Sequence, residues 1–532
     1  MPVTEYKHHM MGIRRLRLLH LLSIGVLIGV FGSRCGQPPK KPVAPALDVA
    51  QPWTDPELDG NQQRSAQLRE LTAATTNPAA PAYVITHATI MTATGEVFAP
   101  GTLMMHAGAI TFVGPDSASP PAPAGAQLFD GTGVVVTPGI IDAHSHIGVY
   151  SAPNGRGGND GNEMTAPVTA QARAEYGYAP NDPQITRALA GGVTTALILP
   201  GSANLVGGRG FTVMMRPARI ADEAAFPGAP PTIKMACGEN PKRVYGDKGG
   251  PGTRMGEYAA FRAAFAEASE YERKIKTYSR ERAQWLARRD RAAQLNAAWK
   301  TKSTAPGIKG EVGPTPPARD VKLETLAAVL RGDVLVQVHC YKAADMAQML
   351  AIADEFGFKI RSFHHALEAY KIRDMLVQRN IAINTWADWW GFKFEAFDGI
   401  PENAALFTEQ GGRATIHSDS AIGIQRLNQE AAKALRAGRA TGVPLTDSDA
   451  LRWITANPAW VLGIDSVTGT LEVGKRGDVV MWSGSPLSVY SRPLRVFIAG
   501  EVAFDRAVGA PLTDFELGNS ARDRNPQESS QP

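Results

Sequence analysis

The chain has 532 residues, of which 44% are hydrophobic and 20% charged, the composition of a globular protein rather than of a disordered chain. This length exceeds that of a typical single domain, so we expect one large domain with a smaller companion, or a barrel with insertions. The formal net charge is +4, but residues 1–41 contain seven lysines and arginines against one glutamate. The rest of the chain is therefore mildly acidic. It lacks the net positive charge that is typical of proteins that bind nucleic acids.

Residues 1–35 have the pattern of a signal peptide or a membrane anchor. Basic residues precede an apolar run at 18–32, which is long for a signal-peptide core and short for a membrane-spanning helix. A lipoprotein signal would place an acylated cysteine at Cys35, but Arg34 stands where a small residue is expected. Cleavage, acylation and retention of the segment stay open. We predict an exported protein, either periplasmic or attached to a membrane by its N-terminus and facing the periplasm or the outside.

Only two cysteines, Cys237 and Cys340, lie beyond Cys35. Two cysteines cannot form a disulfide framework, and they exclude cysteine-rich zinc modules. We expect both to be small buried residues, because unpaired cysteine packs like a small apolar side chain.

The two ends of the globular part share one pattern. A Pro-rich linker and N-terminal extension at 36–81 leads into short β-rich runs with glycine and proline turns at 82–137, and the same pattern returns at 464–510. We predict that 82–137 and 464–510 form the two parts of one flanking β-sandwich. The last residues, 511–532, are predicted to be a disordered tail.

Between these parts, residues 138–463 alternate apolar β-branched runs with amphipathic helices. One unit has Asp182 as N-cap, Pro183 at the first helical position and Gly191 as the stop, before a buried strand at 193–199. Repeated units of this kind predict an α/β fold, a (β/α)₈ barrel of the TIM type with its active site at the carboxyl ends of the strands.

A long charged segment at about 254–320 interrupts this rhythm. Its mixed charges and many helix-forming residues predict a solvated helical insertion. A partner-binding arm or a contact in a homo-oligomer is the alternative interpretation.

Six histidines lie at or just after the ends of predicted barrel strands: His144, His146, His339, His364, His365 and His417. Two others, His87 and His106, fall in the sandwich strands, and we assign them no role. Residues at i and i+2 in a strand project to the same face, so His144 and His146 can point two imidazoles at one ion. A lone pair of this kind is weak grounds for a metal site, and its context decides.

The stretch TPGIIDAHSHIG, which contains both histidines, resembles the first-strand signature of the amidohydrolase superfamily. These proteins are metal-dependent hydrolases built on a (β/α)₈ barrel with a flanking β-sandwich, and the resemblance extends over most of 82–505. Four segments resemble the imidazolonepropionase-like branch: GVTTALILPGSANLVGG, TIKMACGENPKRVYG, VLVQVHCYKAADM and HALEAYKI. The resemblance implies a hydrolase of carbon–nitrogen bonds other than peptide bonds, acting on a small-molecule amide or cyclic amide.

The resemblance also implies a set of metal ligands. His144 and His146 match the first strand, His339 the fifth, His365 the sixth and Asp419 the eighth. The neighbouring His364 is the alternative to His365, because adjacent residues of a strand face opposite sides. A bridge between two metal ions is implied at Lys234, in a context where related enzymes carry a carboxylated lysine, and Glu239 is its alternative.

Neutral imidazoles and carboxylates suit borderline divalent ions such as Zn²⁺, so we expect one or two such ions, with zinc favoured. Zinc lowers the pKa of a bound water to about 7 and polarises a carbonyl. Asp419 is then the expected catalytic group, which accepts the proton of the nucleophile and delivers it to the leaving nitrogen. The predicted substrate pocket includes Glu368, Trp386 and His417.

Three other functions stay open. An exported dipeptidase or prolidase-like enzyme would act on peptide-like amides. Deaminases of this superfamily usually carry a glutamate where this chain has Lys342, which argues against deamination, although Glu368 leaves it open. A non-catalytic scaffold would keep the barrel and lose ligands, whereas all five ligands implied by the strand ends are present.

Overall fold

The computed structural model describes residues 66–152, 155–300 and 312–509. The predicted signal or anchor, most of the predicted linker and the predicted tail lie outside these ranges. Within them, no helix combines the length and the apolar character needed to cross a membrane.

An eight-stranded sheet forms the central barrel, and its strands are neighbours in the order in which they occur along the chain. Nearly every residue of these strands is buried, which explains their apolar, β-branched sequences. The strands are β6 (Ile140–Ser145), β7 (Val193–Ile198), β8 (Val206–Met214), β9 (Thr232–Ala236), β10 (Leu335–Cys340), β11 (Ile360–His365), β12 (Ala382–Thr385) and β13 (Ala414–Ile416).

The third barrel strand departs from the predicted all-parallel arrangement. Strand β8 runs antiparallel to both β7 and β9, whereas the other neighbouring strands pair in parallel. Only seven residues, 199–205, join β7 to β8, and a parallel crossover needs a dozen or more. The regular βα alternation predicted for 138–463 therefore fails at this one strand.

Helices follow most of the strands, and the local signals place their ends. The Asp182 side chain accepts a hydrogen bond from the Gln184 amide (2.8 Å) at the start of α3, which ends before Gly191. The helices of the barrel are α2 (Ala174–Gly177), α3 (Pro183–Ala190), α4 (Ala221–Ala224), α5 (Glu239–Tyr245), α7 (Val321–Arg331), α8 (Ala343–Phe356), α9 (Arg373–Gln378), α10 (Asn403–Glu409), α11 (Leu427–Ala440), α12 (Asp447–Arg452) and α13 (Ala456–Leu462).

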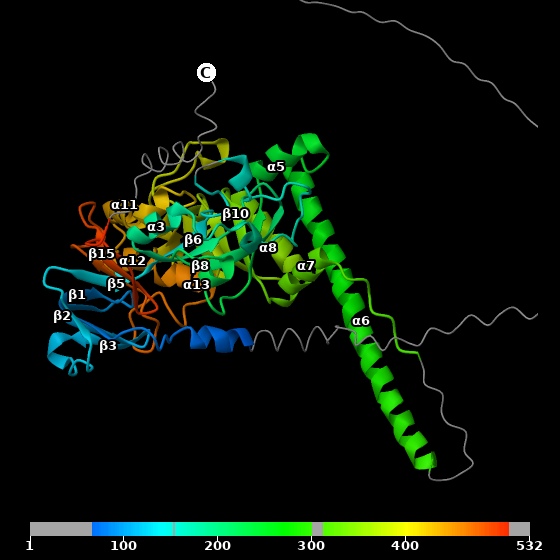
Figure 1. Cartoon of the computed structure of the whole chain (residues 1–532). Coiled ribbons are helices and arrows are strands. Elements are labelled where there is room, and N and C mark those ends of the chain that lie inside the picture. Colours follow the sequence, from blue (N-terminus) through cyan, green and yellow to red (C-terminus); the bar gives the residue numbers. More distant parts are fainter. Residues whose placement is uncertain (1–65, 153–154, 301–311, 510–532) are drawn as a thin grey trace, which may run out of the picture. The chain divides into compact units, whose positions relative to one another are not determined.

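The charged segment forms one helix of 47 residues, α6 (Arg254–Lys300). Its first half buries Phe261, Phe265 and Tyr271 and packs against α7 and α8. None of its described residues after Tyr278 is buried. Figure 1 shows this second half of α6 continuing past α7 and α8, so only the first half is held by the barrel.

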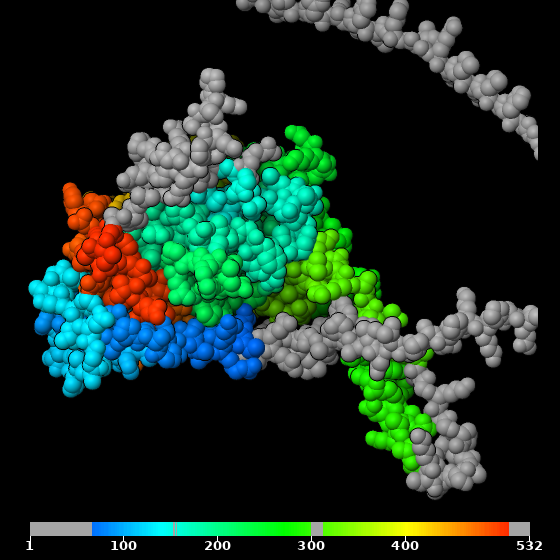
Figure 2. All heavy atoms as spheres, viewed as in Figure 1, coloured from blue at the N-terminus to red at the C-terminus, as the bar shows by residue number. Residues whose placement is uncertain are grey.

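The two ends of the globular part hydrogen-bond into one sheet, in the order β16-β15-β14-β5-β1-β2-β3, with β4 also paired to β1. The join is the antiparallel pair β5–β14, and Figure 2 shows the blue N-terminal and red C-terminal segments side by side. An apolar cluster that includes Ile85, Leu103 and Phe497 fills this part. The strands are β1 (Tyr83–Met91), β2 (Val97–His106), β3 (Ala109–Pro115), β4 (Gln127–Asp130), β5 (Val135–Pro138), β14 (Val479–Trp482), β15 (Pro493–Ile498) and β16 (Glu501–Asp505).

One tryptophan joins this sheet to the barrel. Trp482 is 1% exposed, and its indole Nε1 donates to the Thr137 hydroxyl (2.9 Å) across the β5–β14 pair. Its ring covers Gly192, where an added Cβ would lie 3.1 Å from the indole. Gly192 also has φ +94°, a conformation that favours glycine. The turn from α3 into β7 is thus shaped to receive the tryptophan.

We expect Trp482→Ala to lower the free energy of unfolding by about 3–5 kcal/mol, because it removes a large buried ring and leaves a cavity between sheet and barrel. Urea unfolding followed by circular dichroism measures the change. Trp390→Ala is the matched control, because this side chain is 60% exposed and its loss should change stability by less than about 0.5 kcal/mol. Equal effects of the two substitutions would contradict the packing described for Trp482.

Candidate metal centre

Four of the predicted ligands meet at the carboxyl ends of the barrel strands. The Nε2 atoms of His144 and His146 lie 3.3 Å apart, and Asp419 Oδ1 lies 3.6 Å from the first and 3.1 Å from the second. Lys234 Nζ lies 3.2 Å from His144 Nε2. These four side chains come from β6 and the residue after it, from β9 and from the segment after β13, so the sheet itself brings them together.

The other two predicted ligands lie beside this group. The ring of His365 is 4.9 Å from that of His144 and 4.5 Å from that of His339, centre to centre. Both rings are buried, and the Nδ1 atom of each has no hydrogen-bond partner. Unpaired buried nitrogens are unusual, because burial removes the water that would otherwise bind them. A second group that could hold a cation consists of His144, His365 and His417, while His339 lies beside it.

Backbone geometry holds two of these residues in place. His365 has φ +68° and Asp419 has φ +48°, in the left-handed region that residues other than glycine seldom adopt. The Asp419 amide donates to the His144 carbonyl (3.0 Å), and the His365 amide donates to His417 Nε2 (3.3 Å). Such conformations cost of order 1–3 kcal/mol and concentrate at functional sites.

Asp142 of β6 links the first barrel strand to the segment that follows the last one, β13. Its Oδ1 accepts from the amides of His144 (3.1 Å) and Ser418 (3.1 Å). Burial raises the pKa of Asp142 to about 7, against the lowering effect of these hydrogen bonds. One buried carboxyl therefore sets the spacing between His144 and the segment that carries Asp419.

The arrangement fits a divalent cation. His146 Nδ1 lies 2.7 Å from the Leu199 carbonyl oxygen, which can only accept, so this nitrogen carries a proton and donates it. Burial would raise the pKa of Asp419, but its hydrogen bond with His146 and the nearby positive groups outweigh burial and lower it, so the group is a carboxylate. The carboxylate and His146 Nε2 face each other at 3.1 Å, and such a pair needs a proton or a metal ion between its members.

The protonation states of the other predicted ligands also suit the binding of a divalent cation. Burial, together with the positive charge of nearby groups, holds the pKa values of His144, His339 and His365 well below the usual range, so these rings are neutral. Neutral imidazole is the form that binds metal ions. Burial also lowers the pKa of Lys234 to about 7, although the nearby Asp419 carboxylate opposes this.

The structure distinguishes the two residues considered for the bridge. Lys234 is 1% exposed and touches His144, as described above. The Glu239 carboxylate, at the start of α5, instead lies 3.3 Å from the Lys393 ammonium. Lys234 therefore has the better placement.

Because adjacent residues of a strand face opposite sides, one of His364 and His365 was predicted to point away from the site. His364 nevertheless points toward it. Its ring centre lies 4.8 Å from that of His144, and its Nδ1 lies 3.0 Å from His144 Nδ1. The alternation fails because His365 leaves the extended conformation at the strand end. His364 thus lies deeper in the barrel, where both its nitrogens already contact protein atoms.

The three predicted pocket residues have different positions. Trp386 stacks on His365 with ring centres 4.5 Å apart, and its Nε1 donates to the Ser418 carbonyl (3.1 Å). The His417 ring lies 4.9 Å from His365, centre to centre. The Glu368 carboxylate is occupied elsewhere: it pairs with Lys342 (2.8 Å) and accepts from the Ala343 amide (2.9 Å).

Sequence reasoning missed several residues around the rings. Tyr341 stacks on His365 (5.0 Å), and Asn240 Nδ2 lies 3.4 Å from His339 Nε2. Tyr341 follows His339 by two positions, and Gln337 precedes it by two, so both share its face of the strand. That spacing was a usable signal for them, whereas Asn240 comes from α5 and had none.

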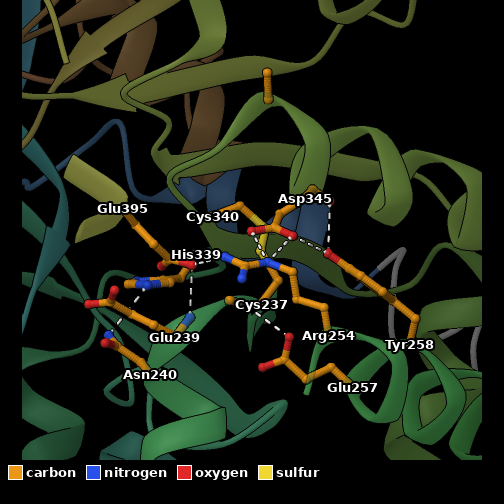
Figure 3. Close-up of a disulfide and its surroundings, with 12 residues drawn as sticks. Cys237, Glu239, Asn240, Arg254, Glu257, Tyr258, His339, Cys340, Asp345 and Glu395 are labelled. Atoms are coloured by element: carbon orange, nitrogen blue, oxygen red, sulfur yellow. Dashed lines mark hydrogen bonds and ion pairs between the residues drawn. A yellow bond between two sulfur atoms is a disulfide. The ribbon is translucent and has the colours of Figure 1, made fainter. Parts of the chain in front are cut away.

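Cys237 and Cys340 are buried, as expected, and they are joined by a disulfide that was not expected, with Cα atoms 5.4 Å apart. Figure 3 shows it next to His339 and close to the Arg254 side chain. Cys340 is adjacent to His339, and Cys237 lies three residues after Lys234, so the bond ties together two strand ends that carry predicted ligands. No local pattern indicates this pairing, because 103 positions separate the two residues.

The disulfide predicts a thiol count. The denatured full-length chain should give one reactive thiol before reduction, from Cys35, and three afterwards, as measured with a thiol-specific chromogenic reagent. The Cys237→Ser/Cys340→Ser variant should give one thiol in both states and lose about 2–4 kcal/mol of stability. Three thiols in the wild-type chain before reduction would contradict the pairing.

Comparisons with known proteins agree on one family. The model of the amidohydrolase family matches residues 398–515. The curated protein amidohydrolase tasK from Hapsidospora irregularis is 36% identical over 423 residues, which are 77% of this chain and 40% of that protein. This chain thus spans less than half the length of that curated relative.

One solved structure matches this chain over the whole of its own length. An amidohydrolase from Thermotoga maritima MSB8 has 33% sequence identity and a TM-score of 0.66, with 80% of this chain and 100% of that chain covered. A putative prolidase from Bifidobacterium longum has 18% identity and a TM-score of 0.45, with 84% and 99% covered. The second likeness is too low to support an argument about activity.

Proposed function

Because the chain belongs to the amidohydrolase family, we propose that it is a metal-dependent hydrolase that opens a carbon–nitrogen bond of a small amide or cyclic amide. The observation that carries this proposal is the meeting of His144 Nε2, His146 Nε2 and Asp419 Oδ1 within 3.6 Å of one another. Three ligand atoms of this chemistry favour zinc over magnesium or calcium, which prefer oxygen ligands.

His144, His146 and Asp419 would hold one ion, and His339 and His365 a second, with Lys234 between them. A bound divalent ion of this kind supplies a Lewis acid for the amide carbonyl and lowers the pKa of water. Since the pKa of Lys234 is lowered to about 7, part of its amine is neutral near pH 7 and can react with carbon dioxide. The resulting carbamate is an anion, and it would replace a buried cation by a bridging ligand.

Asp419 is the residue that would move the proton. One of its oxygens lies against both His144 and His146, while its side chain is 24% exposed and so reaches the open end of the barrel. It can accept a proton from the attacking water and return it to the leaving nitrogen. The left-handed backbone at Asp419 and its amide hydrogen bond to His144 fix the direction of the carboxylate.

The surroundings favour a substrate with an apolar group. Trp386 stacks on His365, and Trp389 stacks on Trp386 with ring centres 5.0 Å apart. Trp389 also lines a groove of about 840 Å³ along α11, together with Ile422 and Val489. Arg426, Glu430, Lys433 and Arg436 also line this groove, so its walls carry charged as well as apolar side chains. The stacked rings thus lead from a predicted ligand to a groove where a flat or aliphatic part of the substrate would lie on the apolar side chains.

Deamination is the less favoured reaction on this scaffold. Lys342, which stands where deaminases carry a glutamate, lies 2.8 Å from the Glu368 carboxylate. This ion pair occupies the one nearby acid that had left deamination open. No contact in the described residues favours it over amide hydrolysis.

We also propose that the enzyme acts outside the cytoplasm. The apolar run at 18–32 supports export, and the Cys237–Cys340 disulfide supports it independently, since such bonds persist mainly in oxidising compartments.

A substrate screen of the zinc-loaded protein tests the proposed reaction. Dipeptides, N-acyl amino acids, lactams and imidazolones are incubated with and without a chelator, and released amine or ring opening is measured. We expect hydrolysis of at least one amide class, best for members with an apolar group, and loss of activity on chelation. Activity on aminopurines or aminopyrimidines without any amide hydrolysis would refute the proposal that the enzyme hydrolyses amides.

The substitution Asp419→Asn tests the proton-transfer role on whichever amide is hydrolysed. It should lower kcat/KM by a factor of about 10²–10⁴ or more, because the amide side chain cannot accept the proton. Circular dichroism should show the wild-type fold. The matched control is Asp354→Asn, at an exposed aspartate on α8 that pairs with Arg379, and its kcat/KM should not change. Wild-type turnover by the Asp419 variant would refute the role.

A further inference from the structure

A buried line of polar side chains crosses the barrel interior beneath the candidate centre. Gln337 from β10, Ser362 and His364 from β11 and His144 from β6 are each at most 1% exposed. Polar groups this deeply buried are costly unless each is hydrogen-bonded, so their donors and acceptors can be assigned in order.

The orientation of the Gln337 amide follows from its contact with a main-chain oxygen. Gln337 Nε2 donates to the Val461 carbonyl (3.3 Å), which can only accept. This contact turns the other amide atom, Gln337 Oε1, toward β11, where it accepts from the Ser362 hydroxyl and lies 2.9 Å from His364 Nε2. An amide oxygen has no proton to give, so His364 Nε2 must carry one.

Ser362 supports the same orientation from the side. Its hydroxyl oxygen accepts from Asn384 Nδ2 (2.8 Å) and lies 3.0 Å from His364 Nε2. Because the Ser362 proton is directed to Gln337, this oxygen can only accept from His364. Both contacts of His364 Nε2 therefore require an N–H at that position.

The remaining nitrogen of His364 then acts as an acceptor. The contacts of the ring are an amide, a hydroxyl and a second imidazole, and none carries a negative charge that would stabilise an imidazolium. The ring is therefore neutral, and its Nδ1 has a lone pair. His144 Nδ1, 3.0 Å away, must donate to it, which leaves His144 Nε2 without a proton.

We propose that His364, oriented by Gln337 and Ser362, is a positioning residue that fixes the tautomer of His144 and keeps its Nε2 ready to bind a metal ion. The inference rests on the proposed metal centre, and it goes beyond it by assigning a role to a histidine that is not itself a ligand. His146 reaches the same state by another route, through the Leu199 main-chain carbonyl. His144 Nδ1 donates to a side chain, whereas His146 Nδ1 donates to a main-chain oxygen. Of these two hydrogen bonds, a substitution of the acceptor residue can therefore remove only that of His144.

The test compares His364→Leu with His364→Asn. Leucine removes the acceptor for His144 Nδ1, whereas asparagine can place its Oδ1 near the position of the lost Nδ1. We expect His364→Leu to weaken zinc binding about 10–100-fold, measured by competition with a chelating dye, and His364→Asn to recover most of the loss. His87→Leu, at an exposed histidine, is the matched control and should bind zinc as the wild type does.

A second readout does not involve the metal. In the metal-free wild-type protein, ¹⁵N NMR of labelled histidines should show His144 protonated at Nδ1, with the signal assigned from the His144→Gln variant. The same signal should change in His364→Leu. If that variant does not fold, Gln337→Met replaces it, and it should weaken zinc binding and disturb the tautomer in the same direction.

The outcomes separate this inference from the proposed function. Wild-type zinc affinity in a folded His364→Leu variant, or a proton on Nε2 of His144 in the wild type, would overturn the inference and leave the metal centre standing. Failure of the wild-type protein to bind zinc would refute the metal centre, and the NMR measurement would still decide the tautomer.

Discussion

The structure is organised around an electrostatic constraint: two imidazole nitrogens and a carboxylate oxygen are held within 3.6 Å of one another at the end of a barrel. Such atoms repel unless a proton or a cation lies between them. The chain could relieve the repulsion by turning one ring or one carboxylate outward. It does not, because each group is held from behind: His146 by the Leu199 carbonyl, His144 by His364, and Asp419 by its own left-handed backbone.

Much of the remaining architecture serves to keep these groups in place. Asp142 joins the first strand to the segment after the last one, and the Cys237–Cys340 disulfide joins the ends of β9 and β10. The flanking sheet packs on the barrel through Trp482 over Gly192, far from the chemistry in sequence. These contacts lie on different elements, so the geometry of the centre depends on the barrel as a whole.

The strand ends show what sequence could predict. The i, i+2 spacing placed His144 and His146 on one face, and the signals at Asp182 and Gly191 predicted the two ends of one helix correctly. These features are local, so the residue pattern contains them. The identities of the later ligands came instead from resemblance to a family, since no spacing relates His339 to Asp419.

The remaining features are not local, and for that reason the sequence did not reveal them. The direction of β8 depends on a short connection, 199–205, whose partner strand lies further along the chain. The disulfide joins residues 103 positions apart. The placement of His364 depends on the left-handed turn at His365, which reverses the face expected from strand alternation. The network through Gln337 joins residues of β6, β10 and β11, which are far apart in the sequence.

The most direct test of the account is the position of the metal. Crystals of the zinc-loaded protein, measured on both sides of the zinc absorption edge, give an anomalous difference map that locates the ion without regard to activity. We expect a peak about 2.0–2.1 Å from the Nε2 atoms of both His144 and His146, next to Asp419. A map with no peak there, or with zinc bound only elsewhere on the chain, would contradict it.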